Sequence, residues 1–368
     1  MSAVAKPTTN GRPRVPVAPA IAPVPLEHED LVVHRGRRSG LYMAVAIHST
    51  ALGPALGGVR LWHYGEPIEA VRDALRLARG MTYKAAAAGL DLGGGKGVVC
   101  APATPPSASE RRALLLDFGD LVESFDGRYV TAEDVGITPA DLAVIAERTE
   151  HVTGLAAERG GSGDPSPFTA LGVEAAMRAC ARERFGSPEL AGLRVSIAGL
   201  GHVGAKLARR LADRGAEVVA SDVDPAKRSI AESIGARWVE PERELTVACD
   251  VLAPCALGGA IDTQIADELR CEIVCGCANN QLADEGLVDD LTERGILYAP
   301  DYVVNAGGLI HVDREIHGRT EAEAVELVLG IESALDRVFE LARDGGVTPL
   351  AAARRLAEER LGAAAVRD

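Results

Sequence analysis

The first half of the chain mixes strand-like and helical patterns of hydrophobic residues. Residues 68–88 place Val71, Ala74, Leu75 and Ala78 on one side of a helix and arginines on another side. Apolar runs bounded by glycine and proline surround this helix and are typical of strands. The pattern also predicts strands at 41–48, 59–62, 97–101 and 128–131 and a second helix at 109–125.

The second half alternates strands and helices in a regular order. Apolar strands separated by helical stretches occur at 193–198, 217–222, 250–255, 272–277 and 295–299. Alternation of this kind builds a parallel, doubly wound sheet. Further helices are predicted at 168–185, 320–343 and 349–365, of which the second begins with a capping box at Thr320 and Glu323.

A chain of 368 residues is too long for one ordinary core and indicates about two domains. We expect a disordered tail at 1–25, which holds six prolines, and a first α/β domain at 26–165. The Gly- and Pro-rich stretch at 158–167 predicts a hinge, followed by a doubly wound domain at 166–331. The helices within 332–368 are expected to lie back against the first domain.

The composition excludes several classes of protein. A formal net charge of -14 argues against nucleic acid or an anionic membrane surface as partner. No apolar run reaches the roughly 18 residues needed to span a membrane. An odd count of seven cysteines indicates reduced thiols and a cytoplasmic protein. Cys275 and Cys277 lie in an apolar strand, which fits a buried core better than a metal site, so we expect no metal.

Residues 80–97 combine two lysines with small apolar neighbours. Lys84 and Lys96 bracket this run, and Lys96 follows three glycines that would let the backbone approach a ligand closely. Poor solvation and repulsion between the two ammonium groups push the pKa of a lysine down towards the range of a general base. The alternative is a surface loop with two solvated lysines, because charged residues beside glycine often mark turns.

Two carboxylates follow the strand predicted at 128–131. Glu133 and Asp134 stand next to each other just before Gly136. At the end of a strand, one of them could point into a cleft and act as an acid or a base. An ordinary helix or turn cap is the alternative.

Residues 193–204 form a strand followed by three glycines in G-x-G-x-x-G spacing at the start of a helix. Such glycines permit a tight turn, the approach of a pyrophosphate and close helix packing, and free N–H groups at the helix start attract phosphates. The next strand ends in Asp222, which would bond the adenosine ribose and repel a 2′-phosphate. We therefore predict NAD binding, rather than NADP binding, at Gly199, Leu200, Gly201, His202, Val203 and Gly204.

Asparagines follow two later strands. Asn280 lies in the loop 278–281, and Asn305 begins the loop 305–308. Their amides could meet a nicotinamide, although asparagine is also a common turn residue.

With these features assembled, the chain resembles the amino acid dehydrogenases of the glutamate, leucine, phenylalanine and valine group, and most closely their branched-chain members. The likeness covers nearly everything from about residue 26 to 361. It rests on motifs in the same order, at 53–58 (GPALGG), 81–84 (MTYK), 92–96 (LGGGK), 131–136 (TAEDVG), 165–167 (PSP), 253–257 (APCAL), 278–281 (ANNQ) and 300–308 (PDYVVNAGG).

The resemblance implies a reversible oxidative deamination, in which an L-amino acid, NAD and water give a 2-oxo acid, ammonia and NADH. Lys84 matches the lysine that holds the substrate carboxylate. Lys96 matches the catalytic lysine that activates water, and Asp134 matches the acid that shuttles protons to and from the amine. These roles also suit the residues on chemical grounds, because an ammonium pairs with a carboxylate and a lysine of lowered pKa can act as a base.

The resemblance further assigns the two domains. It implies that the first domain binds substrate and forms a homo-oligomer, with Gly57 and Gly58 near the substrate. The second is implied to be a Rossmann-type NAD-binding domain, in which Thr169 contacts the nicotinamide carboxamide and Asn280 and Asn305 contact the cofactor or its ribose.

We expect the substrate side chain to be apolar. Where glutamate dehydrogenases grip a side-chain carboxylate with lysine and serine, the matching positions resemble Leu56 and Val312, which cannot pair a buried charge. Ala132 and Leu309 would complete an aliphatic pocket. Leu309 stands where leucine dehydrogenases usually carry valine, so the pocket would be shallower by about one methylene and would favour valine over leucine and isoleucine.

Other functions remain open on the sequence. The protein could prefer leucine or phenylalanine within the same family, or act on hydroxy acids, a class that usually relies on a His and Arg pair. It could also be an NAD-binding regulator with a dead site, although intact Lys84, Lys96 and Asp134 speak against this.

Overall fold

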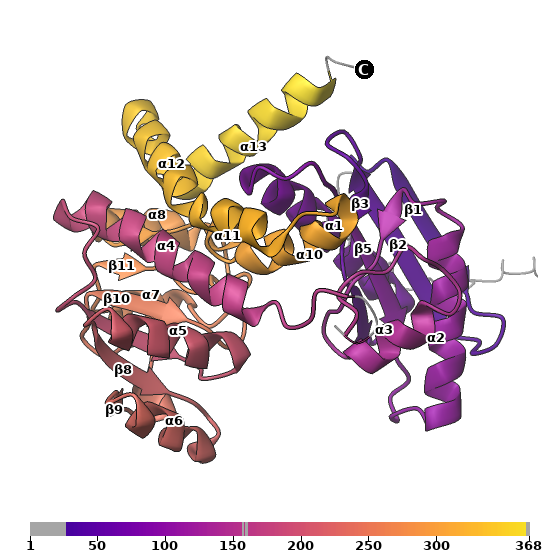
Figure 1. The fold of residues 1–368 in the computed structure, drawn as a ribbon, viewed down its shortest axis with the longest axis horizontal. Helices are drawn as coiled ribbons and strands as arrows, with labels where there is room; N and C mark the ends of the chain where they lie inside the picture. The colour runs from indigo at the N-terminus through magenta and orange to yellow at the C-terminus, as the bar shows by residue number, and fades with distance from the viewer. Residues whose placement is uncertain (1–26, 157, 159–160, 366–368) are drawn as a thin grey trace, which may run out of the picture.

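The computed structural model describes residues 27–156, 158 and 161–365, so the tail predicted at 1–25 lies outside the described residues. These residues form two α/β units, each built around a six-stranded sheet. The first unit, indigo to magenta in Figure 1, lies beside the second, magenta to orange. The two-domain α/β fold expected from the sequence is therefore confirmed.

The first sheet is mixed, and β5 lies at its centre. The strands β1 and β2 and the strands β2 and β5 pair antiparallel, whereas β3 and β4 each pair parallel with β5. The sixth strand, β6, pairs parallel with β3. The strands of this sheet are β1 (Asp30–Arg35), β2 (Tyr42–Ser49), β3 (Ala55–Leu56), β4 (Val59–Trp62), β5 (Gly93–Cys100) and β6 (Tyr129–Val130).

Helices cover both faces of this sheet. The helix α1 (Pro67–Ala87) begins with a proline and a capping box formed by Glu66 and Glu69, and its alanine-rich face packs on β2 and β5. The helices α2 (Ala108–Glu123) and α3 (Pro139–Ile145) bury leucine, isoleucine and phenylalanine in a second cluster with residues of β2 and β4. The small side chains of α1 let it approach β5 closely, which matters for the site below.

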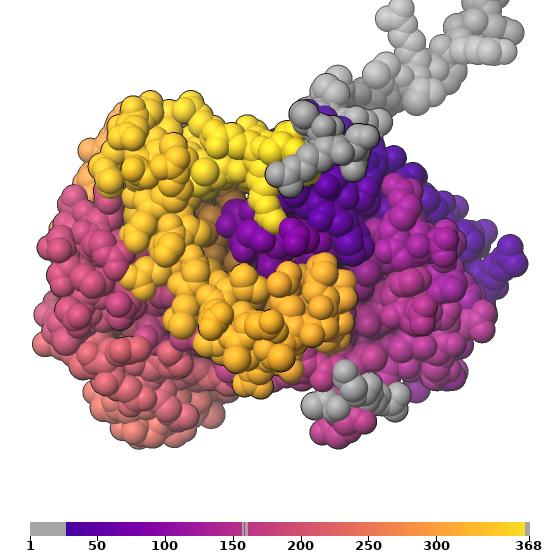
Figure 2. Space-filling view, turned by 45° about the horizontal axis from the view of Figure 1, so that its top comes forward, coloured from indigo at the N-terminus to yellow at the C-terminus, as the bar shows by residue number. Residues whose placement is uncertain are grey.

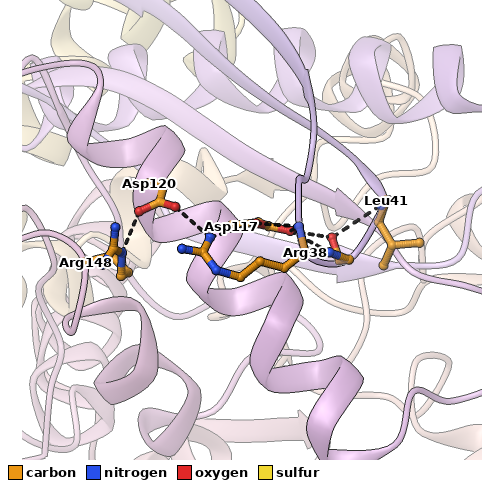
Figure 3. A network of polar contacts seen from close by, with 6 residues as sticks. Arg38, Leu41, Asp117, Asp120 and Arg148 are labelled. Carbon is orange, nitrogen blue, oxygen red and sulfur yellow. Dashed lines mark hydrogen bonds and ion pairs between the residues drawn. The ribbon is translucent and has the colours of Figure 1, made fainter.

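A polar network ties the turn between β1 and β2 to α2 (Figure 3). Asp117 is almost fully buried and accepts hydrogen bonds from the backbone N–H groups of Arg38 (3.0 Å) and Ser39 (2.8 Å) and from the Arg38 guanidinium (2.9 Å). Arg38 also reaches Asp120, which pairs with Arg148. Burial alone would raise the pKa of Asp117, but these donors bring it below its usual range. The network fixes the β1–β2 hairpin, and with it the neighbour of β5, against the helix.

The second sheet is entirely parallel, with strand order β12-β11-β10-β7-β8-β9. Adjacent residues of β10 point to opposite faces, so that Val251 and Ala253 join one apolar cluster and Leu252 joins another. Helices α4 and α5 lie on the first of these faces and α7 and α8 on the second, which confirms the doubly wound arrangement. The strands are β7 (Arg194–Ala198), β8 (Glu217–Ser221), β9 (Arg237–Trp238), β10 (Val251–Pro254), β11 (Ile273–Val274) and β12 (Leu297–Tyr298).

The helices of the second half are more numerous than the sequence pattern predicted. The helix expected at 320–343 is two helices, because the chain is interrupted at Gly330, a residue that disfavours a helix interior. The α-helices are α4 (Ser166–Phe185), α5 (His202–Asp213), α6 (Arg228–Ser233), α7 (Thr263–Glu268), α8 (Leu287–Glu293), α9 (Asp301–Val304), α10 (Gly307–His317), α11 (Glu321–Leu329), α12 (Ile331–Gly345) and α13 (Pro349–Ala365).

The two C-terminal helices make different contacts. Helix α13 reaches across to α1 of the first unit, where Arg360 donates to the carbonyl of Ala86 (3.1 Å) and pairs with Asp91 (2.9 Å). Helix α12 packs on α4 of the second unit instead, through Ile331, Leu335 and Phe339 among others. The expectation that all of 332–368 lies against the first domain is therefore wrong for α12. Figure 2 shows α13, in yellow, spanning the two units above a hollow.

No helix in the described part of the chain is long and apolar enough to cross a bilayer.

Candidate active site

Lys96 lies in the central strand of the first sheet, not in a loop or at a strand edge. It pairs with Ala46 of β2, and its side chain is only 6% exposed. The strand begins at Gly93, four residues earlier than the pattern predicted. The alternative of a solvated surface lysine is therefore wrong.

The glycines before and after Lys96 serve the packing of the protein itself. A Cβ atom at Gly94 would lie 2.1 Å from the backbone nitrogen of Thr82 in α1, and one at Gly95 would lie 2.6 Å from the ring of Tyr129. A Cβ at Gly97 would lie 2.4 Å from the Phe118 ring. We expected these glycines to let the backbone approach a ligand. In the structure they instead let α1 and two aromatic rings pack closely against β5.

Lys96 and Asp134 form a buried ion pair. The Nζ atom of Lys96 donates to Oδ2 of Asp134 at 2.8 Å, and the Asp134 side chain is 23% exposed. Burial lowers the pKa of Lys96, and the neighbouring carboxylate only partly offsets this. Burial would raise the pKa of Asp134, but the charges of Lys96 and Arg60 hold it below its usual range. The pair thus places an easily deprotonated lysine beside an ionised acid.

Arg60 is a site residue that the sequence reasoning missed. Its Nε atom donates to the same Oδ2 atom of Asp134 at 2.9 Å, and its Nη1 atom donates to Asp73 of α1 at 2.9 Å. Asp73 also accepts from the Tyr64 hydroxyl at 2.7 Å. An arginine between the apolar residues of the strand predicted at 59–62 was the available signal, because an arginine there needs a partner if the strand is buried. Arg60 orients Asp134, and no side chain among the described residues bonds its Oδ1 atom.

Gly58 lies against the backbone that carries Asp134. A Cβ atom there would lie 2.4 Å from the Glu133 carbonyl oxygen and 3.0 Å from the Asp134 Cβ. At Gly57, a Cβ would collide with the Gly95 carbonyl at 1.7 Å, and the Gly57 N–H already donates to Val130 (3.1 Å). Both glycines set how closely the strands and Asp134 approach Lys96, and their predicted substrate contact remains untested.

Lys84 lies in the last turn of α1 and is half-buried. Among the described residues, no side chain or backbone group pairs with its ammonium. Burial lowers the pKa of Lys84 to about 8, the Lys96 charge adds to this, and Asp301 at the start of α9 opposes it. Burial raises the pKa of Asp301, which already accepts from the backbone N–H of Tyr302 at 2.8 Å. Lys84 is thus a desolvated cation without a direct partner, which is a fitting anchor for an anion.

The four predicted pocket residues come from both units and join one apolar cluster. Leu56 of β3 and Leu309 of α10 are buried in the cluster, while Ala132 and Val312 are partly buried and pack against the cluster. Membership of this large cluster does not by itself place the four side chains next to one another. Their contact with a substrate remains a prediction.

The glycine-rich turn has the three features that a bound pyrophosphate needs. Gly199 has a φ of 106°, a Cβ at Gly204 would lie 2.0 Å from the Gly199 carbonyl, and the space beside Gly201 is open. Helix α5 starts at His202 with no side chain capping its first N–H groups. The turn therefore fits a dinucleotide phosphate in the way the spacing predicted.

Asp222 lies directly beside this turn. Its Oδ2 atom accepts from the Leu200 N–H at 2.7 Å, and its Oδ1 atom accepts from the Asp224 N–H at 2.8 Å. Each oxygen keeps a further lone pair, so the carboxylate is fixed in place and can still accept ribose hydroxyls.

The remaining predicted cofactor residues differ in how they are held. The Thr169 hydroxyl donates to the Pro165 carbonyl at 3.1 Å, and Asn280 has a positive φ of 50° with its side chain exposed. Asn305 is buried and donates to Asn279 (2.9 Å), but its Oδ1 atom has no partner within the described structure. A buried amide oxygen without a donor is costly, so Asn305 fits a role as acceptor for a bound group. His202 is exposed and Val203 packs on the core.

Arg60 also lines a cavity of about 560 Å³. It is lined by Trp62, Asp73 and Val135 of the first unit and Leu257 of the second, together with other residues of α1 and β4. Lys84 and Lys96 do not line it, so it is separate from the lysine cluster. Over the described residues, no group of His, Cys, Asp and Glu side chains is arranged to hold a metal ion.

Comparisons with known proteins agree with this geometry. Residues 31–151 match the dimerisation domain of the Glu/Leu/Phe/Val dehydrogenases, and residues 160–367 match the family model for Glutamate/Leucine/Phenylalanine/Valine dehydrogenase. The chain is 45% identical to the leucine dehydrogenase of Thermoactinomyces intermedius over 91% of both chains. It is 46% identical to the valine dehydrogenase of Streptomyces virginiae over 91% of this chain and 94% of that one.

A solved structure is similar as well. The crystal structure of L-tryptophan dehydrogenase from Nostoc punctiforme superposes with a TM-score of 0.82 at 40% identity, covering 93% of this chain and 98% of that one. Both family models together span most of the sequence, and the relatives align over nearly their whole length. The chain therefore belongs to the glutamate, leucine, phenylalanine and valine dehydrogenase family and is an amino acid dehydrogenase.

Proposed function

We propose that this protein catalyses the reversible oxidative deamination of branched-chain L-amino acids with NAD, with L-valine as the preferred substrate. The observation that carries the proposal is the half-buried Lys84 ammonium without a direct partner, close enough to the Lys96–Asp134 pair for the charges to act on each other. One cation is thus left for a carboxylate, while the other has an acid beside it for proton transfer.

The proposed reaction assigns a role to each side chain. Lys84 binds the substrate carboxylate and thereby fixes the α-carbon relative to β5. Asp134, held by Arg60, accepts a proton from the substrate ammonium and returns it on release of ammonia. Lys96, with its lowered pKa, takes a proton from the water that attacks the imine carbon. NAD, when bound, accepts the hydride from the α-carbon.

The cofactor assignment is supported by the second unit. The open space at Gly201, the uncapped start of α5 and the unpartnered Asn305 oxygen all fit a bound dinucleotide. The carboxylate of Asp222 beside the turn favours ribose hydroxyls over a 2′-phosphate. NAD is therefore preferred to NADP.

The substrate side chain is proposed to be aliphatic. The wall formed by Leu56, Ala132, Leu309 and Val312 contains no group that could pair a carboxylate. A charge buried there without a partner costs about 3–5 kcal/mol, which excludes glutamate. Differences of one methylene are worth about 1–3 kcal/mol, so leucine and isoleucine remain substrates behind valine. One relative named above acts on tryptophan, so phenylalanine and tryptophan belong in the comparison.

Initial rates of NADH formation test the proposal. We expect kcat/KM to rank valine first, leucine and isoleucine next within about 10–200-fold, and glutamate lower than valine by about 100-fold or more. The same assay with NADP should be markedly slower. Glutamate or phenylalanine ranking first would overturn the pocket assignment. No NADH from any amino acid would favour the regulator with a dead site.

We also propose that the protein is a homo-oligomer assembled through the first unit. The matched family model is a dimerisation domain. The edge strand β1 exposes Leu31 (37%) and Val33 (50%), and Tyr42 at the start of β2 is 45% exposed. An apolar strand edge of this kind is a common pairing surface. Sedimentation should give a mass of at least two chains, whereas a single species near 38.4 kDa would exclude this assembly.

The cytoplasm is the proposed location, because all seven cysteines are free thiols, as expected in a reducing compartment. Cell fractionation followed by immunoblotting would check it.

A further inference from the structure

Two thiols that the proposed reaction does not use lie together at the carboxyl ends of β10 and β11. Cys255 directly follows β10, and Cys277 lies three residues after the end of β11. The Ala278 N–H donates to the Pro254 carbonyl at 3.0 Å, so the two cysteines flank this contact between the chain segments. The Cys277 thiol donates towards the Cys255 carbonyl at 3.9 Å and also towards the Cys255 sulfur.

Both residues are partly exposed, which distinguishes them from the other cysteine pair of this sheet. Cys180 and Cys275 also interact, but both are fully buried in the core. The expectation that Cys275 is structural is consistent with this burial, whereas Cys277 reaches the edge of the sheet where the site lies. Neighbouring parallel strands are about 4.7–4.9 Å apart, which is within the Cα separation that a disulfide requires.

The surroundings of the pair favour its reactivity. The hydrogen bond from Cys277 lowers the pKa of the Cys255 thiol. The bond to Cys255 and burial raise the pKa of Cys277 well above its usual value, so Cys255 is the nucleophile of the pair and Cys277 the resolving thiol. A thiol of lowered pKa in a partly exposed residue is the one that reacts with oxidants, because the thiolate is the nucleophile.

We propose that Cys255 and Cys277 form a reversible disulfide when the enzyme meets hydrogen peroxide, and that this modification closes the active site. The Cys255 thiolate attacks one peroxide oxygen, the O–O bond breaks, and a sulfenic acid and water form. The Cys277 sulfur then attacks the Cys255 sulfur, the S–O bond breaks, and the leaving hydroxyl takes the Cys277 proton and departs as a second water. Two thiols and one peroxide thus give one disulfide and two waters, and a dithiol reductant reverses the change.

The disulfide acts on the site through the segment that carries Cys277. The Cys277 carbonyl accepts a hydrogen bond from the Asn305 side chain at 3.2 Å. Three residues further on, the backbone N–H of Asn280 donates to Asp301. Drawing the Cys277 sulfur onto Cys255 moves this segment. A displacement on the order of 1 Å in a site costs about 100-fold in rate. This effect does not depend on which amino acid the enzyme prefers.

The test treats the reduced enzyme with hydrogen peroxide and measures three properties. We expect the loss of two free thiols per chain, a cross-link between tryptic peptides 244–270 and 271–294 that fragmentation assigns to Cys255 and Cys277, and loss of NADH binding followed by NADH fluorescence. Activity should fall by about 100-fold. Dithiothreitol should restore all three properties and the activity.

Serine variants provide the controls, each compared with its own untreated sample. Cys255→Ser and Cys277→Ser should both resist inactivation, whereas Cys100→Ser, in the first unit, should be as sensitive as the unchanged enzyme. The proposal would be overturned if peroxide left Cys255 and Cys277 unlinked, or if either of their serine variants lost NADH binding as fully as the unchanged enzyme. Because NADH binding and peptide mapping need no substrate, the result stays separable from the proposed amino acid preference.

Discussion

Replacing Lys96 by alanine is expected to lower kcat with L-valine by about 10²–10⁴-fold, the usual contribution of a positioned general base. The reason is geometric: Nζ of Lys96 is 2.8 Å from Asp134 in a nearly closed environment, and no other amine of the described structure pairs with that carboxylate except the Arg60 guanidinium. A guanidinium stays charged and cannot serve as a base. Steady-state rates would measure the fall in kcat, and titration with NADH followed by fluorescence would measure cofactor binding.

Binding of NADH should stay nearly unchanged in this variant, because the base and the glycine-rich turn lie on different units. Lys227→Ala is a suitable control, since that residue lies beyond β8 and its side chain makes no hydrogen bond or ion pair within the described residues. Turnover near normal in Lys96→Ala would remove this lysine from the mechanism. A joint loss of turnover and NADH binding would indicate misfolding instead. Lys96→Met, whose side chain has a similar length, would then separate misfolding from loss of the base.

Replacing Lys84 by alanine should instead raise KM for L-valine most strongly. Truncating one partner of a buried charge pair costs about 2–5 kcal/mol, which corresponds to roughly 30- to 4,000-fold in affinity. The change in kcat should be smaller, because the Lys96–Asp134 pair is left intact. An unaltered KM would show that the carboxylate is held elsewhere.

The lowered pKa of Lys84 gives this assignment a second test. With a pKa of about 8, the ammonium is lost as pH rises through that value, so kcat/KM for valine should fall on the alkaline side. In Lys84→Arg the side chain stays charged, and this alkaline fall should disappear even if the overall rate is lower. The same fall at the same pH in Lys84→Arg would assign it to another group.

The sequence was most informative where the function of a residue depends on its immediate neighbours. The roles of Gly199, Gly201 and Gly204 follow from their spacing between a strand and a helix, and the structure has the positive φ, the open space and the close contact in the predicted order. Asp222 was placed correctly for the same reason, since it ends the next strand.

The glycines around Lys96 show what the sequence could not reveal. A side chain at these positions would collide with Thr82, Tyr129 or Phe118. These residues lie on other elements and reach β5 only in the folded protein. Local reasoning therefore assigned these glycines to a ligand. The interruption at Gly330 was missed because the apolar pattern continues on both sides of it.

Arg60 was missed for a related reason. Its bonds to Asp134 and Asp73 connect a strand, a loop and a helix that are separated by up to 74 residues. Periodicity identifies which face a residue occupies, but it does not say which distant carboxylate lies opposite. The one sign available in the sequence was an arginine between the apolar residues of a predicted strand.

A crystal structure of the protein with NAD and 3-methyl-2-oxobutanoate, the 2-oxo acid of valine, would test the central claim most directly. This mixture cannot react, because the reverse reaction needs NADH and ammonia. The account predicts the carboxylate at hydrogen-bond distance from Nζ of Lys84, the 2-carbonyl facing Lys96 and Asp134, and the isopropyl group against Leu56, Ala132, Leu309 and Val312. A carboxylate bound by another cation, with Lys84 left free, would contradict it.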